Sequence, residues 1–135
     1  MVSGKMTVEE VDQLFRFLPW LAAHEGSFVE RWAGGQQRDG AHEFPRPVYL
    51  PEVREFFELA AHCCGPGAGY DPGVAHAMLQ SDAAIARAGV RDIMSMLTYC
   101  VRGERFCDGH WDVVLRSGQV TKLLCRLREL RHALE

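Results

Sequence analysis

A long apolar stripe in the C-terminal half of the chain constrains the fold most. Apolar side chains recur there at the spacing of one helix face, over about five turns. They are Ile85, Val90, Ile93, Met94, Leu97, Cys100 and Val101. This spacing predicts a long helix that begins at Ser81 or Asp82 and ends between Arg102 and Arg105. One face of that helix must be buried against other elements.

Other segments show the same helical spacing. Thr7 is a good N-cap with Glu10 three residues later, so a capping box should start a helix over residues 8–23, which Pro19 kinks or divides. Further helices are expected over residues 51–62, 74–80, 110–116 and 119–134. Because no run of alternating strands is visible, the predicted fold class is all-α, mostly helical. We expect a single compact domain over residues 1–135, with about five or six helices.

Residues 34–51, "GGQQRDGAHEFPRPVYLP", contain the longest break in the helical pattern. Gly, Pro and polar residues dominate this stretch, which is typical of irregular structure. The sequence therefore predicts a long irregular loop, with at most a short extended segment over residues 48–50.

Composition excludes several classes of protein. The chain has 135 residues, 47% of them hydrophobic and 24% charged, with a net charge of −3. This balance gives no strong pull toward nucleic acid or an anionic membrane, so no membrane partner is expected and a nucleic-acid partner is disfavoured. Without a leader or a long apolar run, a cytoplasmic location with five reduced cysteines is expected.

A polar block follows the long stripe, within "LTYCVRGERFCDGHW" over residues 97–111. If the helix continued, its inward positions would fall at Glu104 or Arg105 and then at Asp108. A lone buried carboxylate costs several kcal/mol, so these acids should be paired. Arg102, Arg105 and His110 are the nearest candidate partners.

Two interpretations of this block remain open. In the first, Arg102 and Arg105 bind a small anionic or polar molecule, and Glu104, Asp108 and His110 supply acid–base chemistry. In the second, the block is a structural ion-pair network, and the chain is a non-enzymatic module that binds protein or nucleic acid. Whether the chain is an enzyme is undecided, and a homodimer is compatible with either interpretation.

The metal-ligand patterns in the chain are weak. Cys107 and His110 have a plausible ligand spacing, and His62, Cys63 and Cys64 offer further donors. A single Cys-x2-His pair is not specific, and the second cluster has no firm spacing. There is also no phosphate-binding loop or dinucleotide fingerprint. We therefore expect neither a metal nor a cofactor.

The polar block also carries a resemblance to a known family. It resembles the signature of a bacterial family called domain of unknown function 6508, with an Arg-x-acid-Arg-Phe-x-x-Gly-His core followed by Ser-Gly and a Leu-rich helix. The matching residues are Leu97, Thr98, Arg102, Glu104, Arg105, Phe106, Cys107, Gly109, His110, Ser117, Gly118, Leu124, Arg126 and Leu127. The resemblance implies that the block, residues 97–118, is a family feature, but it implies no activity.

The resemblance adds candidate residues upstream of the block. Tyr70 and Asp71 occupy the first two positions of the family's Phe-Asp-Trp element, and Pro72 replaces the third. We expect Tyr70 and Asp71 to close the site, with Trp111 as a further ligand-binding side chain.

Overall fold

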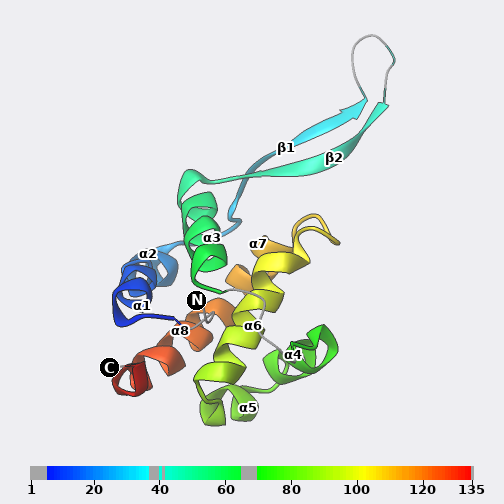
Figure 1. The fold of residues 1–135 in the computed structure, drawn as a ribbon. Helices are drawn as coiled ribbons and strands as arrows, with labels where there is room; N and C mark the ends of the chain where they lie inside the picture. Colours follow the sequence, from blue (N-terminus) through cyan, green and yellow to red (C-terminus); the bar gives the residue numbers. More distant parts are fainter. Residues whose placement is uncertain (1–5, 37–39, 41, 65–69, 135) are drawn as a thin grey trace.

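Helices build most of the molecule, and one hairpin projects from it (Figure 1). The computed structural model describes residues 6–36, 40, 42–64 and 70–134. The elements in these residues are α1 (Val8–Phe15), α2 (Leu18–Ala23), β1 (Val29–Gln36), β2 (His42–Tyr49), α3 (Pro51–Cys63), α4 (Pro72–Leu79), α5 (Asp82–Arg87), α6 (Val90–Gly103), α7 (His110–Arg116), α8 (Gln119–Glu129) and the 3₁₀ helix η1 (Arg131–Leu134). The prediction of a mostly helical fold is confirmed, although the helices in the described residues exceed the expected five or six.

The first helical segment begins and divides as its sequence indicates. The Thr7 hydroxyl accepts the backbone N–H of Glu10, and the Glu10 carboxylate accepts the N–H of Thr7, so the capping box is formed. The helix then divides, and Pro19 lies in the first turn of α2. A missing N–H costs nothing at that position, because first-turn donors have no helical partner.

The long C-terminal helix predicted from residue 81 is wrong, because the chain breaks between α5 and α6. Ala88 and Gly89 adopt extended backbone conformations there. Glycine loses more conformational freedom in a helix than any other residue, which favours a break at this point. The apolar stripe survives the break, because Ile93, Met96 and Leu97 of α6 are all buried.

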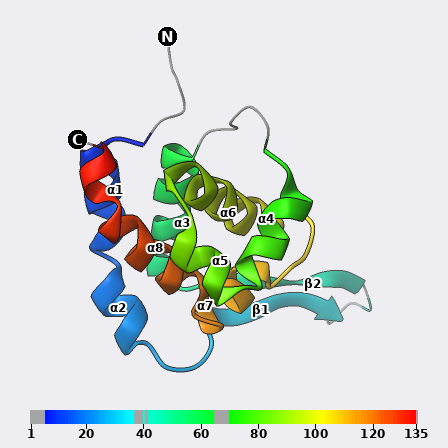
Figure 2. The same cartoon turned by 90° about the horizontal axis from the view of Figure 1, so that it is seen from below.

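The core forms where α6 and α8 meet near the middle of the helical body (Figure 2). α6 contacts α3, α4 and α7, whereas α8 contacts α1, α2, α5 and α7. The largest fully buried side chains are Phe56, Phe57, Leu14, Ile93, Met96, Leu97, Leu123, Leu124, Leu127, Val11, Val53 and Val120. In the part of the chain that the structure describes, no helix has both the length and the apolar character needed to cross a bilayer.

The expected loop over residues 34–51 is instead part of an antiparallel hairpin. Trp32 pairs with Pro47 and Ala33 pairs with Arg46, and the register shifts once on each side of this region. Gly34 and Gly35 both have positive φ, +90° and +88°, which glycine adopts without the usual steric cost. Two prolines and two glycines conceal the strands in the sequence, because such residues are typical of loops.

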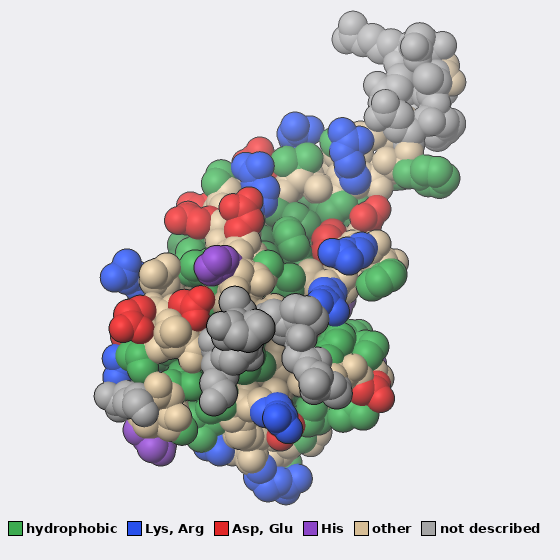
Figure 3. Space-filling model, viewed as in Figure 1, with side chains coloured by type: hydrophobic (Ala, Val, Ile, Leu, Met, Phe, Trp, Pro, Cys, Tyr) green, Lys and Arg blue, Asp and Glu red, His purple; other side chains and the backbone are tan. Residues whose placement is uncertain are grey.

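Toward its outer end the hairpin stands away from the helices (Figure 1), and the space-filling view shows it as an extension of the helical body (Figure 3). Its strands contact each other far more than they contact any helix. At the root, the N–H of Leu50 donates to the carbonyl of Phe28 at 3.2 Å and closes the ribbon. Side-chain contacts to the α6–α7 region must therefore set the direction of the hairpin.

We predict that Gly34→Ala opens the hairpin more than Gly35→Ala does. A Cβ at residue 34 would lie 2.5 Å from the carbonyl oxygen of Phe44, whereas a Cβ at residue 35 meets nothing within 4 Å. Both variants carry the strain of a positive φ, about 1–2 kcal/mol, so the difference isolates the clash. Amide hydrogen exchange at Ala33 and Arg46 measures the effect. Equal protection in the two variants would contradict this account of Gly34.

Candidate functional site

Glu104 is the central residue of the polar block. It is the C-cap of α6, and its carboxylate accepts three hydrogen bonds. Oε1 accepts the Tyr49 hydroxyl at 2.6 Å and the Trp111 backbone N–H at 2.8 Å. Oε2 accepts the backbone N–H of Gly109 at 2.9 Å. Both oxygens are thus engaged by donors from β2 and from the start of α7.

The same carboxylate starts α7. Gly109 is the N-cap of this helix, with a φ of +93°, and glycine has no side chain that could cap it. Glu104 replaces the missing cap by accepting N–H groups of the first turn, where a negative charge also suits the helix dipole. Glu104 and Gly109 therefore together end α6 and begin α7.

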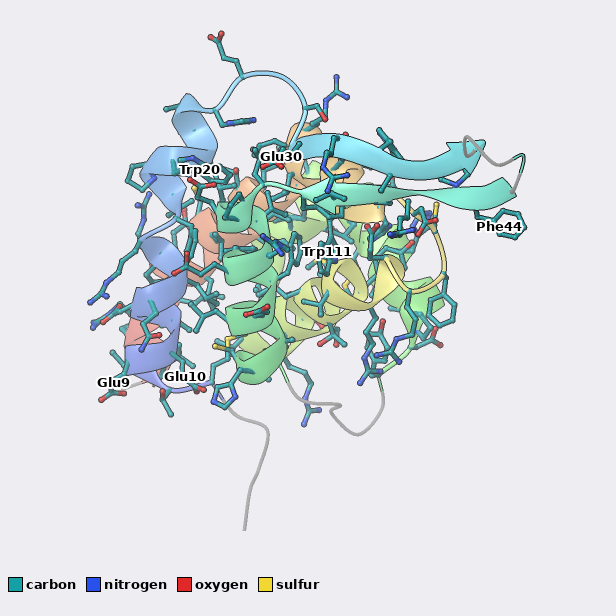
Figure 4. The ribbon with its side chains drawn as sticks, turned by 90° about the horizontal axis from the view of Figure 1, so that it is seen from above. Glu9, Glu10, Trp20, Glu30, Phe44 and Trp111 are labelled. Carbon is teal, nitrogen blue, oxygen red and sulfur yellow. The ribbon has the colours of Figure 1, made fainter. Side chains whose placement is uncertain are left out.

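Two further residues of α7 complete a seat for the hairpin. Asp112 Oδ1 accepts the backbone N–H of Phe28, just before β1, at 2.7 Å. The Trp111 ring stacks on the Phe57 ring of α3, with 4.4 Å between the ring centroids. The centroid of the Tyr49 ring lies 5.1 Å from that of Trp111. Figure 4 shows Trp111 beneath the strands. We call Glu104, Trp111 and Asp112 the hairpin socket.

Tyr49 is the residue of the hairpin that enters the socket. Its side chain is only 4% exposed. Burial, followed by the neighbouring Glu104 carboxylate, raises the pKa of the Tyr49 hydroxyl far above its ordinary value. The hydroxyl therefore keeps its proton at neutral pH and donates it to Glu104.

The other site residues predicted from the sequence fall in two places. Arg105 and Asp108 lie exposed in the turn after α6, and no ion pair joins either of them to another described residue. Arg102 lies over the Tyr70 ring, 5.4 Å from its centroid, so these two residues do meet. Asp71 accepts the N–H groups of Gly73 and Val74 and caps α4. Ligand-binding and catalytic roles for all of these residues stay predictions.

His110 packs its ring against the backbone of α6. A side chain at Gly103 would overlap the ring, so the fit requires glycine there. Nε2 of His110 is buried without a hydrogen-bond partner in the described residues. Burial lowers the pKa of His110, and the charge of Glu104 partly opposes this effect. The Tyr99 ring lies 5.3 Å away, and its hydroxyl bonds His76 Nδ1 at 2.9 Å.

Sequence reasoning missed Tyr49, Asp112 and the pair formed by His76 and Tyr99. The expected partners of Glu104 were Arg102, Arg105 and His110, yet its partners are a phenol and two backbone amides. Local spacing cannot show the Tyr49 contact, because Tyr49 is far from Glu104 in the sequence. The position of Tyr49 between proline-rich segments was the only available signal.

The cysteine and histidine residues do not gather around a metal-sized site. In residues 6–36, 40, 42–64 and 70–134, no group of three or more His, Cys, Asp or Glu side chains could hold a metal ion. Burial raises the pKa of the Cys63 thiol to about 11 and that of Cys100 to about 12. Thiols in this state are poor nucleophiles and poor metal ligands.

We predict that Glu104→Gln weakens the hairpin socket. All three partners of the carboxylate are donors, so the amide group of Gln must face one of them. Hydrogen bonds to charged groups contribute about 1.5–3 kcal/mol each, and the loss should be of this size. Tyr49→Phe should cost a similar amount in the parent chain and much less in the Glu104→Gln background. Urea denaturation of the four proteins measures this coupling.

A matched control for this cycle is Asp108→Asn, which changes an exposed acid in the neighbouring turn. It should leave the free energy of unfolding within about 0.5 kcal/mol of the parent value. Additive costs for the Tyr49 and Glu104 substitutions would mean that the two side chains do not interact in solution.

We also predict a pH dependence of stability that arises from His110. Its pKa in the folded state lies below the ordinary value of 6.5, so the folded state favours the neutral ring. The contribution of His110 to the free energy of unfolding is fully present above pH 6.5. It is lost as the pH falls below this value, with a slope of up to about 1.4 kcal/mol per pH unit. In His110→Asn, unfolding monitored from about pH 7 to about pH 5 should show a shallower loss. The exposed His62→Asn control should keep the parent slope.

Comparison with known proteins covers the C-terminal part of the chain. Residues 70–133 match the model of a family of unknown function (DUF6508). The matched segment begins at Tyr70 and contains the whole hairpin socket, whereas the hairpin itself precedes it. No curated protein and no solved structure matches the chain. The resemblance inferred from the polar block is therefore confirmed, because residues 70–133 match the model of that family.

Proposed function

We propose that the chain is a non-enzymatic interaction module, in which the helical body holds the β1–β2 hairpin out as a protein-binding arm. The observation that carries this proposal is the exposure of large aromatic side chains on the ribbon. Phe44 of β2 is 92% exposed and Trp32 of β1 is 54% exposed. Aromatic side chains are enriched in the cores of protein–protein interfaces.

The geometry of the arm supports this role. Phe44 lies toward the free end of the hairpin and points away from the helices (Figure 4). An isolated two-stranded hairpin is marginally stable in water, and this one receives side-chain support at its root and from Trp32, whose ring lies near Gly109. Binding a partner along the ribbon would bury its aromatic side chains and add the missing support.

The state of the polar block also favours a module over an acid–base enzyme. A general acid or base must reach a substrate proton, directly or through one water. Glu104 instead has both oxygens bonded within the protein, and Asp108 is exposed in a turn. The block fits the role of a joint between helix and hairpin.

The chemistry of the two strand edges indicates how a partner would bind. A two-stranded sheet has two outer edges with unpaired backbone groups. Pro45 and Pro47 remove donors from β2, and proline in a paired strand places its nitrogen on the unpaired side. β1 contains no proline. We therefore expect an extended segment of another protein to add beside β1, with apolar side chains that cover Trp32.

Site-specific photo-crosslinking inside cells that express the protein tests whether the hairpin binds a partner. With p-benzoylphenylalanine in place of the exposed Arg31 of β1, we expect one adduct of discrete mass. The same amino acid in place of the exposed Arg128 of α8 should give none. Adding Phe44→Ser to the Arg31 probe should remove the adduct, because the apolar contact is lost, while the circular dichroism of the protein stays unchanged.

Mass measurement of the adduct distinguishes a foreign partner from a second copy of this chain. Absence of any adduct at residue 31, or equal adducts at residues 31 and 128, would refute the arm as an interaction surface.

A further inference from the structure

We propose that a hollow between the α2–β1 loop and the α7–α8 turn binds a small organic anion, namely a carboxylate with a flat apolar body. The hollow has a volume of about 410 Å³. This lies within the range of about 300–1,000 Å³ that small-molecule sites occupy. Figure 2 shows the loop from α2 to β1 running past the α7–α8 turn. The hollow is formed by neither the arm nor the polar residues predicted from the sequence.

The floor of the hollow is apolar. Leu21 of α2, Phe28 at the foot of β1 and Leu115 of α7 line it, and all three belong to the buried core. The His24 ring lies 4.3 Å from the Phe28 ring at a tilt of 36° and extends the aromatic wall. His24 Nε2 donates to the carbonyl oxygen of Ser27 at 2.9 Å, which holds the ring in place. A flat apolar group would bury its surface against these side chains.

The rim of the hollow carries positive charge. Arg116 and Lys122 both line it, with side chains 57% and 47% exposed. Each is joined to one acid, Arg116 to Asp112 at 3.4 Å and Lys122 to Asp82 at 2.8 Å, but neither acid lines the hollow. The side chains are therefore held in position while further donors remain available, since an ammonium carries three and a guanidinium five.

Other groups on the rim add to the preference for an anion. Thr121 brings a hydroxyl to the lining. Gly118, at the start of α8, brings no side chain, and the helix has no side-chain cap. The positive end of the α8 dipole thus adds to the field of the two cations.

The two halves of the lining together define the ligand class. A neutral aromatic molecule would leave the cations without a new partner, and inorganic phosphate would leave the apolar floor uncovered. An aromatic carboxylate satisfies both halves at once. Because the cations are partly exposed and screened by salt, we expect weak binding, in the range of about 10 µM to about 1 mM.

Titration of the full chain with benzoate, followed by amide chemical shifts, tests this site. We expect saturable shifts that centre on Gly26, Phe28 and Thr121. Benzyl alcohol keeps the aromatic ring without the charge, and inorganic phosphate keeps the charge without the ring. Each should bind at least about tenfold more weakly than benzoate.

Variants then separate a specific site from general attraction to cations. Lys122→Gln should weaken benzoate binding about three- to tenfold, as expected for one partly exposed charge contact. Arg128→Gln, an exposed cation on the same helix outside the hollow, should leave binding unchanged. Thr121→Phe, which fills the hollow from its rim, should abolish binding while the rest of the spectrum is preserved.

Three results would overturn the proposal. They are the absence of saturable shifts up to about 10 mM benzoate, phosphate binding as tight as that of benzoate, or equal weakening by Lys122→Gln and Arg128→Gln. None of these results bears on the arm, because crosslinking at residue 31 does not involve the hollow.

Discussion

The arrangement of this protein depends on one carboxylate that accepts three hydrogen bonds. Glu104 ends α6, begins α7 and receives the phenol of Tyr49 from the hairpin. An ionised carboxylate has two oxygens that together accept several hydrogen bonds. Its charge makes each of these bonds stronger than a bond to a neutral acceptor. Three segments of backbone are therefore fixed at one point, and the direction of the arm follows from it.

This role explains why charged residues follow the most regular apolar stripe in the chain. The stripe buries α6 against α3, α4 and α8, and the polar block then redirects the chain rather than continuing into the core. Glycines at positions 103 and 109 serve the same turn, one by admitting the His110 ring and the other by its positive φ. The residues that match the family thus include both the socket and the packing that supports it.

Elements encoded by neighbouring residues could be predicted from the sequence, whereas contacts between distant residues could not. The capping box at Thr7 and the bounds of α7 follow from local chemistry, and both are as expected. The break at Gly89 was missed because the apolar stripe continues across it. The hairpin was missed because its register depends on two glycines with positive φ and on a distant acid. Within the polar block, Glu104 bonds the nearby backbone amides of Gly109 and Trp111, but its third partner, Tyr49, lies outside any local window.

The prolines of β2 have a consequence for assembly. A ribbon with two open edges can add strands on both sides without limit, which is how fibres grow. Here one edge is closed by Pro45 and Pro47, so a strand that joins β1 completes the sheet. If the joining strand belongs to a second copy, the prolines of both copies face outward, and growth stops at two. In such a dimer, the sequence feature that resembled a loop would set the upper limit on stoichiometry.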